Sequence, residues 1–350
     1  MQIIILAEEV GPKLWPVTSE AVPKAFLPVY SESSLLEETL TRTLPIVEGD
    51  GNNVTIVTLE KAVDSLVAQK TLDSFGIPRT NILAIPESKG SAWSIWEAIR
   101  FLLDVKEIPP EESVLITPSD QFMWPKELAM FHYYNVTSHL VSNPGKFVAV
   151  CLTPGGPSPG LNYFYGDWQQ VSTMGIPYED TILGTVSTLN VNIEGYQMMP
   201  DIESAKDLVA NNWMWDLNTY GATLEMFDHY LRGALGENVS QIMRWGTLET
   251  TSFSTVIPTI LEDRCLAGAL IPKIAWSTLD NWVSIKHLLY DSGLFQPQGQ
   301  ADVHSIESQN NLIFKPPSKT VALYGVTDLI VIDVGDKLLI GTSEGLHEYF

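Results

Sequence analysis

The sequence has few cationic residues for its length. Its 350 residues include 20 Lys and Arg against 42 Asp and Glu, which gives a formal charge of −22. A charge of this sign repels nucleic acids and anionic membrane surfaces within the screening range, so we expect no polynucleotide partner. The same field opposes a nucleoside triphosphate. An anion site in this chain therefore needs locally concentrated cations or a bound metal ion.

Cysteine is nearly absent, and the chain does not open on a long apolar segment. Cys151 and Cys265 are too few for a disulfide framework, and such low cysteine content suits the reducing cytosol. The apolar residues 1–7 run directly into Glu8 and Glu9. This run is too short for a signal peptide or a membrane span. We therefore expect a cytoplasmic protein without membrane contact.

Several common chemical patterns are missing as well. The six His are scattered, and the sequence contains no evident metal-ligand cluster, nucleophile with an adjacent base, or Rossmann glycine fingerprint. The composition, with 45% hydrophobic and 18% charged residues, is that of a globular chain with a large core. The length allows one large domain with an appendage, or two ordinary domains.

The first half alternates short apolar runs with helical patterns. Strands are predicted at residues 2–7, 53–58, 81–85, 113–117 and 147–152, and helices at residues 34–44, 62–74, 91–103 and 124–143. Continuous apolar runs of this kind are typical of strands that are buried on both faces. The alternation predicts an α/β fold with an open, mostly parallel sheet flanked by helices.

The second half is less regular. Residues 153–160 contain three Pro and three Gly and predict a loop, residues 181–193 predict an antiparallel strand, and residues 202–210 and 221–235 predict helices. A turn-rich segment at residues 293–300 predicts a boundary between a domain of residues 1–292 and a β-rich domain of residues 293–350. Short β runs in that tail, at residues 311–314, 320–324, 329–333 and 337–341, are compatible with a few β-helix rungs.

Three blocks near the start carry a family resemblance. Residues 3–16 read I-I-I-L-A-E-E-V-G-P-K-L-W-P, residues 23–28 read P-K-A-F-L-P, and residues 34–40 read S-L-L-E-E-T-L. In order and spacing they resemble the opening of mannose-1-phosphate guanylyltransferases, which is far more specific than a lone glycine pattern. The resemblance implies a Rossmann-like nucleotide-diphospho-sugar transferase fold. It also implies conversion of GTP and mannose 1-phosphate to GDP-mannose and pyrophosphate.

The resemblance also implies the residues of a nucleotide site. The loop after the first strand and two later segments would line it, through Leu6, Ala7, Glu8, Glu9, Gly11, Pro86, Gly90, Ser91 and Pro118. Lys13 and Lys24 would be the catalytic cations, with Lys13 in place of the family's Arg. Glu8 and Glu9 stand where the family has glycines. Each carboxylate would oppose a nearby phosphate by about 1 to 4 kcal/mol in a partly screened site.

The metal and sugar sites follow from later blocks. Residues 114–120 resemble the family's V-L-V-L-P-A-D segment, so Asp120 is a candidate Mg²⁺ ligand. The family's second metal carboxylate aligns with Thr278, and Asp280 is the nearest replacement. Tyr163, Met198, Asp216 and Asn218 occupy positions on the sugar side. At residues 198 and 199 two Met replace a Glu and a Lys of the family.

These replacements leave three functional hypotheses open. The chain could be a guanylyltransferase-like protein with weak or lost catalysis, with Mg²⁺ as cofactor if it is active. It could be an inactive regulatory or binding subunit that senses a nucleotide sugar or pairs with an active paralogue. It could also be a nucleotidyltransferase with changed specificity. Each lost contact to the transition state costs about 2 to 4 kcal/mol, which favours a pseudoenzyme. The expected ligands are a nucleotide or nucleotide sugar and a sugar 1-phosphate, and we expect a homodimer or a heteromer.

Overall fold

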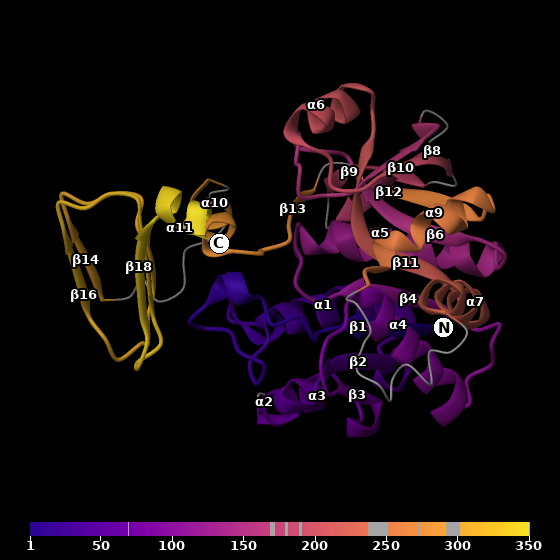
Figure 1. Cartoon of the computed structure of the whole chain (residues 1–350), viewed down its shortest axis with the longest axis horizontal. Coiled ribbons are helices and arrows are strands. Elements are labelled where there is room, and N and C mark those ends of the chain that lie inside the picture. The colour runs from indigo at the N-terminus through magenta and orange to yellow at the C-terminus, as the bar shows by residue number, and fades with distance from the viewer. Residues whose placement is uncertain are drawn as a thin grey trace.

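The computed structural model describes residues 1–68, 70–168, 172–178, 181–188, 191–236, 251–271, 274–291 and 302–349. Its centre is a nine-stranded sheet of order β3-β2-β1-β4-β11-β6-β12-β10-β7, covered by helices (Figure 1). The described helices include none that is both long and apolar enough to cross a lipid bilayer.

The first half of the chain forms the parallel part of this sheet. Its strands are β1 (Gln2–Leu6), β2 (Val54–Leu59), β3 (Ile82–Ile85) and β4 (Ser113–Pro118), each parallel to its neighbours within this group. β1 is almost completely buried because it lies between β2 and β4 under helices on both faces. The predicted strands agree with these to within one residue at each end.

The helices of this half mostly match their predicted positions. They are α1 (Leu35–Thr43), α2 (Val63–Ala68), α3 (Thr71–Ser74), α4 (Ser91–Arg100) and α5 (Lys126–Ser142). The single helix predicted at residues 62–74 is wrong. α2 and α3 are separate because Lys70 adopts a left-handed φ of 58°, through which an α-helix cannot continue. The helix predicted from residue 124 begins at residue 126, after the short strand β5 (Phe122–Trp124).

The second half makes the sheet mixed. It supplies β6 (Phe147–Leu152), β7 (Tyr163–Gly166), β10 (Val191–Gln197), β11 (Met214–Thr223) and β12 (Leu266–Ile271). β11 lies antiparallel between β4 and β6 and was not predicted. It absorbs residues 221–223, so the helix predicted at residues 221–235 begins only at Leu224, as α7 (Leu224–Leu235).

The remaining elements of the second half lie outside the main sheet. β8 (Ser172–Tyr178) and β9 (Thr181–Thr188) form a hairpin, so the strand predicted at residues 181–193 is divided between β9 and β10, and its residues 189 and 190 lie outside the described part. The helices are α6 (Ile202–Ala210), where predicted, and α9 (Ile257–Glu262).

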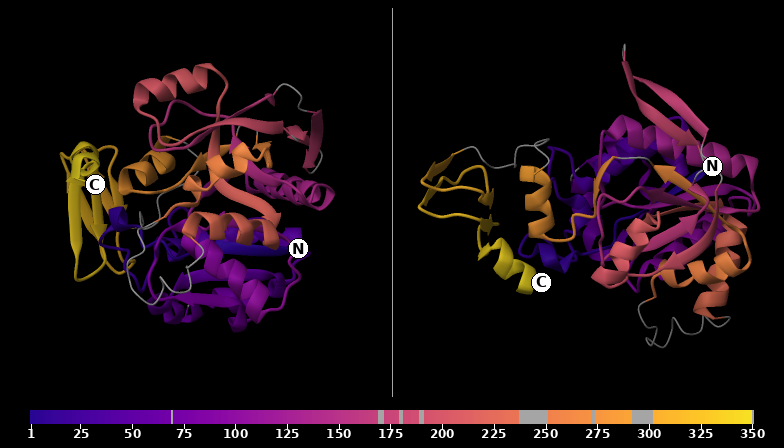
Figure 2. Two further views of the ribbon diagram at one scale, coloured as in Figure 1. Left: turned by 45° about the vertical axis from the view of Figure 1, so that its right-hand side comes forward. Right: turned by 90° about the horizontal axis from the view of Figure 1, so that it is seen from above.

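The C-terminal strands stand apart from the main sheet, with α10 (Trp282–Asp291) between the two (Figures 1 and 2). They are β14 (Val303–Ile306), β15 (Leu312–Phe314), β16 (Val321–Tyr324), β17 (Leu329–Asp333) and β18 (Leu338–Thr342), followed by α11 (Ser343–Tyr349). Val303 pairs with Val321 and Leu312 with Ile330, an offset of 18 residues in each case. The tail is β-rich as predicted, whereas the predicted boundary near residue 293 lies outside the described residues.

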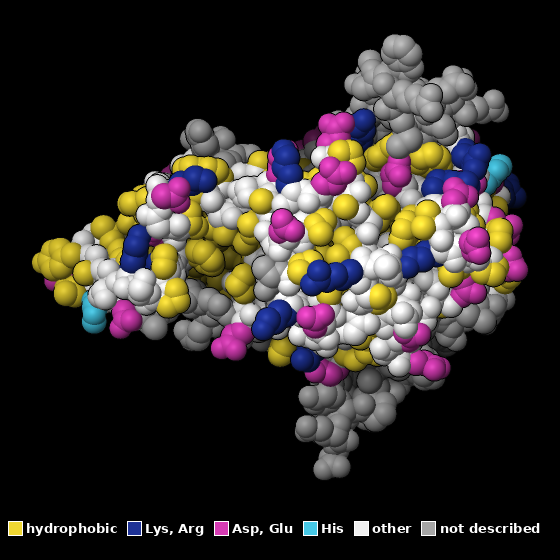
Figure 3. Space-filling view, turned by 90° about the horizontal axis from the view of Figure 1, so that it is seen from below, with side chains coloured by type: hydrophobic (Ala, Val, Ile, Leu, Met, Phe, Trp, Pro, Cys, Tyr) yellow, Lys and Arg dark blue, Asp and Glu magenta, His cyan; other side chains and the backbone are white. Residues whose placement is uncertain are grey.

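One apolar cluster attaches this tail to the main body. Trp282 and Ile285 of α10 pack with Leu14 from the loop after β1 and with Ile330 of β17. Figure 3 shows further hydrophobic side chains on the narrow end that the tail forms. Exposed apolar residues there include Ile306, Tyr324, Leu338 and Ile340. The loop after β1 is therefore held in place from the C-terminal side as well as from the sheet.

Candidate functional site

A cavity of about 500 Å³ opens at the carboxyl ends of β1 and β4. The chain proceeds from β1 to β2 and β3 on one side and then returns to place β4 on the other side of β1. Ligands of open α/β sheets bind at such a switch point. The predicted site residues that line the cavity are Leu6, Glu8, Glu9, Lys24, Gly90, Ser91, Pro118, Asp120, Met198, Asn218 and Asp280.

Ser119 fixes the two strand ends together. Its backbone N–H and its hydroxyl both donate to the carbonyl oxygen of Leu6, at 3.0 and 2.7 Å. Glu8 and Glu9 follow β1, and Asp120 follows β4, so this clamp brings their carboxyl groups to one side of the cavity. The parallel strands explain why residues far apart in the sequence meet here.

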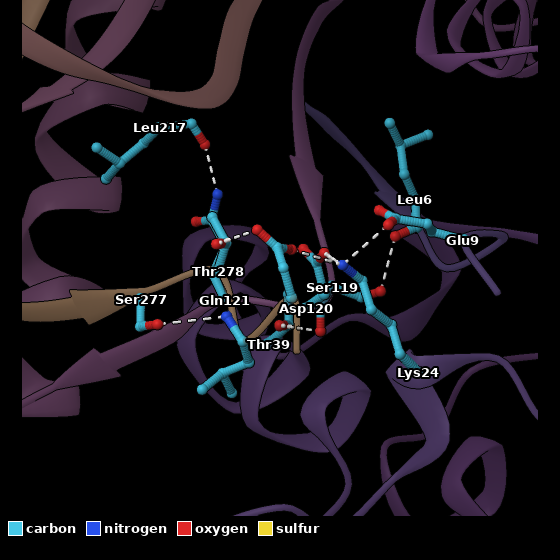
Figure 4. Close-up of polar contacts among 12 residues, drawn as sticks. Leu6, Glu9, Lys24, Thr39, Ser119, Asp120, Gln121, Leu217, Ser277 and Thr278 are labelled. Carbon is cyan, nitrogen blue, oxygen red and sulfur yellow. Dashed lines mark hydrogen bonds and ion pairs between the residues drawn. The ribbon is translucent and has the colours of Figure 1, made fainter. Parts of the chain in front are cut away.

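Lys24 lies at the centre of these acids. Its side chain is 1% exposed, and its Nζ lies 3.1 Å from Glu9 Oε1 and 3.1 Å from Asp280 Oδ1. It also forms a shorter ion pair with Asp120 Oδ2. In Figure 4 the ammonium points between Glu9 and Asp120. One cation therefore contacts three carboxylates.

Asp280 reaches the cluster on a two-stranded ribbon. β13 (Ala275–Ser277) pairs antiparallel with β5, with Ser277 opposite Phe122. Asp120 comes just before β5 and Asp280 just after β13, so the pairing places the two carboxylates side by side. Thr278, directly after β13, donates its hydroxyl to Asp280 Oδ2 at 2.5 Å. Both residues line the cavity.

Gly11 holds the aliphatic stem of Lys24. A Cβ at this position would lie 2.9 Å from Lys24 Cδ, and the backbone has a φ of +70°, so only glycine fits without strain. The hydroxyl of Thr18 donates to the Gly11 carbonyl at 2.9 Å, and the Lys24 N–H donates to the Glu9 carbonyl at 3.3 Å. The loop after β1 thus fixes the position of the Lys24 side chain.

Electrostatics in the cavity are dominated by burial and by acid–acid repulsion. Burial alone would lower the pKa of Lys24, but the surrounding Asp120, Glu9 and Asp280 outweigh it and raise the pKa well above its usual value. Burial raises the pKa of Glu8 to about 7. Although the Glu9 side chain is 65% exposed, its carboxylate faces the cluster, where desolvation and the Asp120 charge raise its pKa.

The acids alone would suit a metal ion, but the cluster as a whole does not. One oxygen from each of Glu9, Asp120 and Asp280 lies within 4.8 Å of the others, and carboxylate oxygens are preferred by Mg²⁺ and Ca²⁺. The Lys24 ammonium already contacts all three. An ion at their centre would require Lys24 to leave a buried position. The residues present therefore do not fit a metal bound among them.

The opposite wall of the cavity carries no charge among its described residues. It includes Met198 and Met199, together with Asn162, whose side-chain amide donates to Ser254 Oγ at 3.0 Å and accepts from the Met199 N–H at 3.3 Å. Sequence reasoning missed the segment of residues 252–254. One residue elsewhere in the sequence hints at its position. Gly90 packs so closely on this segment that a Cβ there would lie 2.4 Å from the Thr251 carbonyl oxygen.

Six predicted site residues do not line the cavity. Ala7, Gly11, Tyr163 and Asp216 are buried behind its walls, and Lys13 and Pro86 are exposed outside it. Asp216 accepts a hydrogen bond from the Tyr220 hydroxyl at 2.5 Å and one from the Asn218 N–H at 2.8 Å. Burial raises the pKa of Asp216 to about 6. This residue positions two residues that do line the cavity.

Comparison with known proteins finds similarity to one family of enzymes. The family model described as Nucleotidyl transferase matches residues 2–140. The xanthan biosynthesis protein XanB of Xanthomonas campestris pv. campestris is 22% identical, in an alignment that covers 99% of this chain and 71% of that protein. A mannose-1-phosphate guanylyltransferase of Escherichia coli is 21% identical, with coverage of 98% and 73%.

Solved structures support the fold. A structure described as mannose-1-phosphate geranyltransferase from Thermus thermophilus superimposes with a TM-score of 0.73 at 20% identity, over 99% of this chain and 96% of that one. The likeness therefore includes the β-rich C-terminal region as well as the main sheet. The first part of the chain is therefore similar to the nucleotidyl transferase family, and distant relatives named mannose-1-phosphate guanylyltransferase align with nearly the whole chain.

Proposed function

We propose that this chain binds a nucleotide or nucleotide sugar, with GTP and GDP-mannose as the first candidates, and that nucleotidyl transfer is weak or lost. The proposal rests on one observation. Among the described residues that line the cavity are four carboxyl groups, those of Glu8, Glu9, Asp120 and Asp280, and a single ammonium, that of Lys24.

This balance is unfavourable for the reaction that the relatives' name describes. In nucleotidyl transfer a sugar phosphate attacks the α-phosphorus of a nucleoside triphosphate, and pyrophosphate leaves with its charge. Catalysis depends on cations positioned around the phosphate oxygens. Each missing cation costs about 2 to 4 kcal/mol of transition-state stabilisation, or roughly 30- to 1,000-fold in rate.

The two lysines expected to supply this charge are poorly placed. Lys13 is exposed and does not line the cavity. Lys24 lines it, but its ammonium is paired with three carboxylates. On the sugar side, Met198 and Met199 contribute neither an acceptor for a hydroxyl nor a cation for a phosphate. The cavity is present, but its described residues lack free cations that would stabilise the charge of a leaving pyrophosphate.

A ligand site without turnover suits a sensing or regulatory subunit. The cavity volume is within the range of small-molecule sites. Its apolar wall and its remaining polar groups could hold a base and sugar without stabilising a leaving pyrophosphate. We therefore prefer the regulatory hypothesis to a nucleotidyltransferase of changed specificity.

Two measurements test the proposal. Pyrophosphate release from GTP and mannose 1-phosphate with Mg²⁺ should not exceed the background of the Asp120→Ala variant. Turnover that this substitution abolishes would contradict the loss of catalysis. Calorimetry with GDP-mannose should give a saturable heat. Absence of both heat and a thermal shift with GDP-mannose and with GTP would remove the ligand-binding role.

A further inference from the structure

The number of donors on Lys24 matches the number of acids around it. A lysine ammonium has three N–H donors and no acceptor. Glu9, Asp120 and Asp280 each place one carboxylate oxygen on this ammonium. No donor is then left for a phosphate oxygen unless one carboxylate withdraws. All the hydrogen-bond donors of the Lys24 ammonium are therefore used by carboxylates of the protein itself.

The ammonium is also held rigidly where it is. Its stem packs against the Gly11 backbone, closer than any Cβ would allow. Its backbone N–H is bonded to the Glu9 carbonyl, and residues 24–26 form a short 3-10 helix whose side chains are all buried. A long flexible lysine usually loses substantial rotamer entropy when it is fixed in this way. Packing and hydrogen bonds with the loop after β1 offset this loss of entropy.

Three acids are more than one lysine needs. A single carboxylate would neutralise Lys24, whereas the three here come from three separate segments, the loop after β1, the start of β5 and the end of β13. Convergence of several carboxylate oxygens within 4.8 Å is the arrangement that a divalent cation takes. The position at its centre is occupied by a side chain.

We propose that Lys24 is the resident cation of this cavity: its ammonium replaces a divalent metal among Glu9, Asp120 and Asp280, so the site takes up no Mg²⁺ and ligand binding needs none. The statement that the site takes up no Mg²⁺ rests only on the contacts of Lys24 with the three carboxylates. The statement on ligand binding rests on the proposed binding of a nucleotide or nucleotide sugar. An ammonium in this position keeps the acids together, but it leaves no metal ion among them to attract phosphates into an acidic cavity.

Manganese provides a direct probe, because free Mn²⁺ in solution is counted by electron paramagnetic resonance. The full chain is titrated without nucleotide. The wild type should bind no Mn²⁺ at the cluster up to several millimolar, whereas Lys24→Met should bind one ion with a Kd of about 0.1 to 1 mM, as in the weaker carboxylate sites of other proteins. The matched control is Lys61→Met, which removes a lysine that is exposed and paired only with Glu20 among described residues. It should behave as the wild type.

The wild-type titration decides the inference even if Lys24→Met does not fold. One Mn²⁺ bound by the wild type and lost in Asp120→Asn would overturn it. A folded Lys24→Met that gains no Mn²⁺ site would overturn it as well. The proposed function fails separately: no heat from GDP-mannose either in EDTA or in Mg²⁺ would remove the ligand and leave the manganese result unchanged. Heat in Mg²⁺ but not in EDTA would instead overturn the inference that ligand binding needs no metal.

Discussion

Two buried lysines in this chain have very different surroundings. Lys24 contacts three carboxylates in the cavity. Lys286 of α10 contacts one carboxylate, that of Asp328, and the hydroxyl of Ser343 at 2.8 Å. The second lysine joins α10 to the start of β17 and to α11. A hydrogen bond and charge from Lys286 hold the pKa of Asp328 below its usual value.

The difference separates a structural ion pair from a candidate functional cluster. At Lys286 the charges balance one to one, and the partner carboxylate is 43% exposed. At Lys24 negative charge is in excess, and the surplus acids face a cavity. Stability alone would not collect three carboxylates around one ammonium, because like charges held close together repel one another.

The largest expected effect is on the stability of Lys24→Met. Removal of the ammonium leaves three carboxylates facing one another, so the free energy of unfolding should fall by about 3 to 5 kcal/mol. Millimolar Mg²⁺ or Mn²⁺ should restore part of it through binding to the folded state. Urea unfolding with and without metal measures both effects. A loss that metal does not reduce would make Lys24 an ordinary structural lysine.

A buried carboxyl without any lysine extends the comparison. The pKa of Asp216 is about 6 in the folded protein, against an ordinary value of 3.8. Because the folded pKa is raised, the stabilising proton is fully present below about pH 4 and is lost as the pH rises through 6. Relative to Asp216→Asn, the wild type should therefore lose about 2 to 3 kcal/mol of unfolding free energy between pH 4 and pH 7. A difference between the two proteins that does not vary with pH would contradict the raised pKa of this buried carboxyl.

Removal of the acidic side chains of Glu8 and Glu9 should make the cavity more favourable for a triphosphate. In the double variant Glu8→Gly with Glu9→Gly, two repulsive groups disappear and one Lys24 donor is released. GTP affinity should rise by about 1 to 2 kcal/mol, or roughly 5- to 30-fold. Calorimetry measures it, with the exposed Glu20→Gln as the control. Unchanged affinity would show that the loop after β1 is not the phosphate site.

The smallest effect is expected at the structural pair. Lys286→Met should cost about 1 kcal/mol, because Asp328 remains partly hydrated. No metal should restore it, since one carboxylate makes no cation site. Urea unfolding beside Lys24→Met provides the contrast. Equal losses and equal metal responses in the two variants would erase the distinction between the two lysines.

The sequence predicted the frame of this molecule better than its chemistry. β1, β2, β3, β4 and β6 are continuous apolar runs, and such runs carry their strand signal locally. β11 does not. Its Asp216 and Asn218 are polar, and its pairing with β6 shifts register between Asp216 and Tyr220. Its place in the sheet is fixed by β4 and β6, which no local pattern reveals.

The site divides in the same way. Block resemblance located Lys24 and Asp120, because each lies in a distinctive segment next to a predicted strand. The contact between Asp280 and Lys24 depends on the pairing of β13 with β5, more than 150 residues apart in the chain. The outward position of Lys13 depends on how the loop closes around Lys24. Neither could be read from spacing, because both are set by tertiary packing.

The central claim is that Lys24 occupies the position among Glu9, Asp120 and Asp280 where a metal would bind, and that the cavity binds its ligand without a metal. The most direct test is a calorimetric titration of GDP-mannose into the wild-type chain, once in EDTA and once in Mg²⁺. We predict binding in both with dissociation constants that agree within about twofold, or about 0.4 kcal/mol. Binding that requires Mg²⁺, or that tightens at least about tenfold with it, would contradict the account.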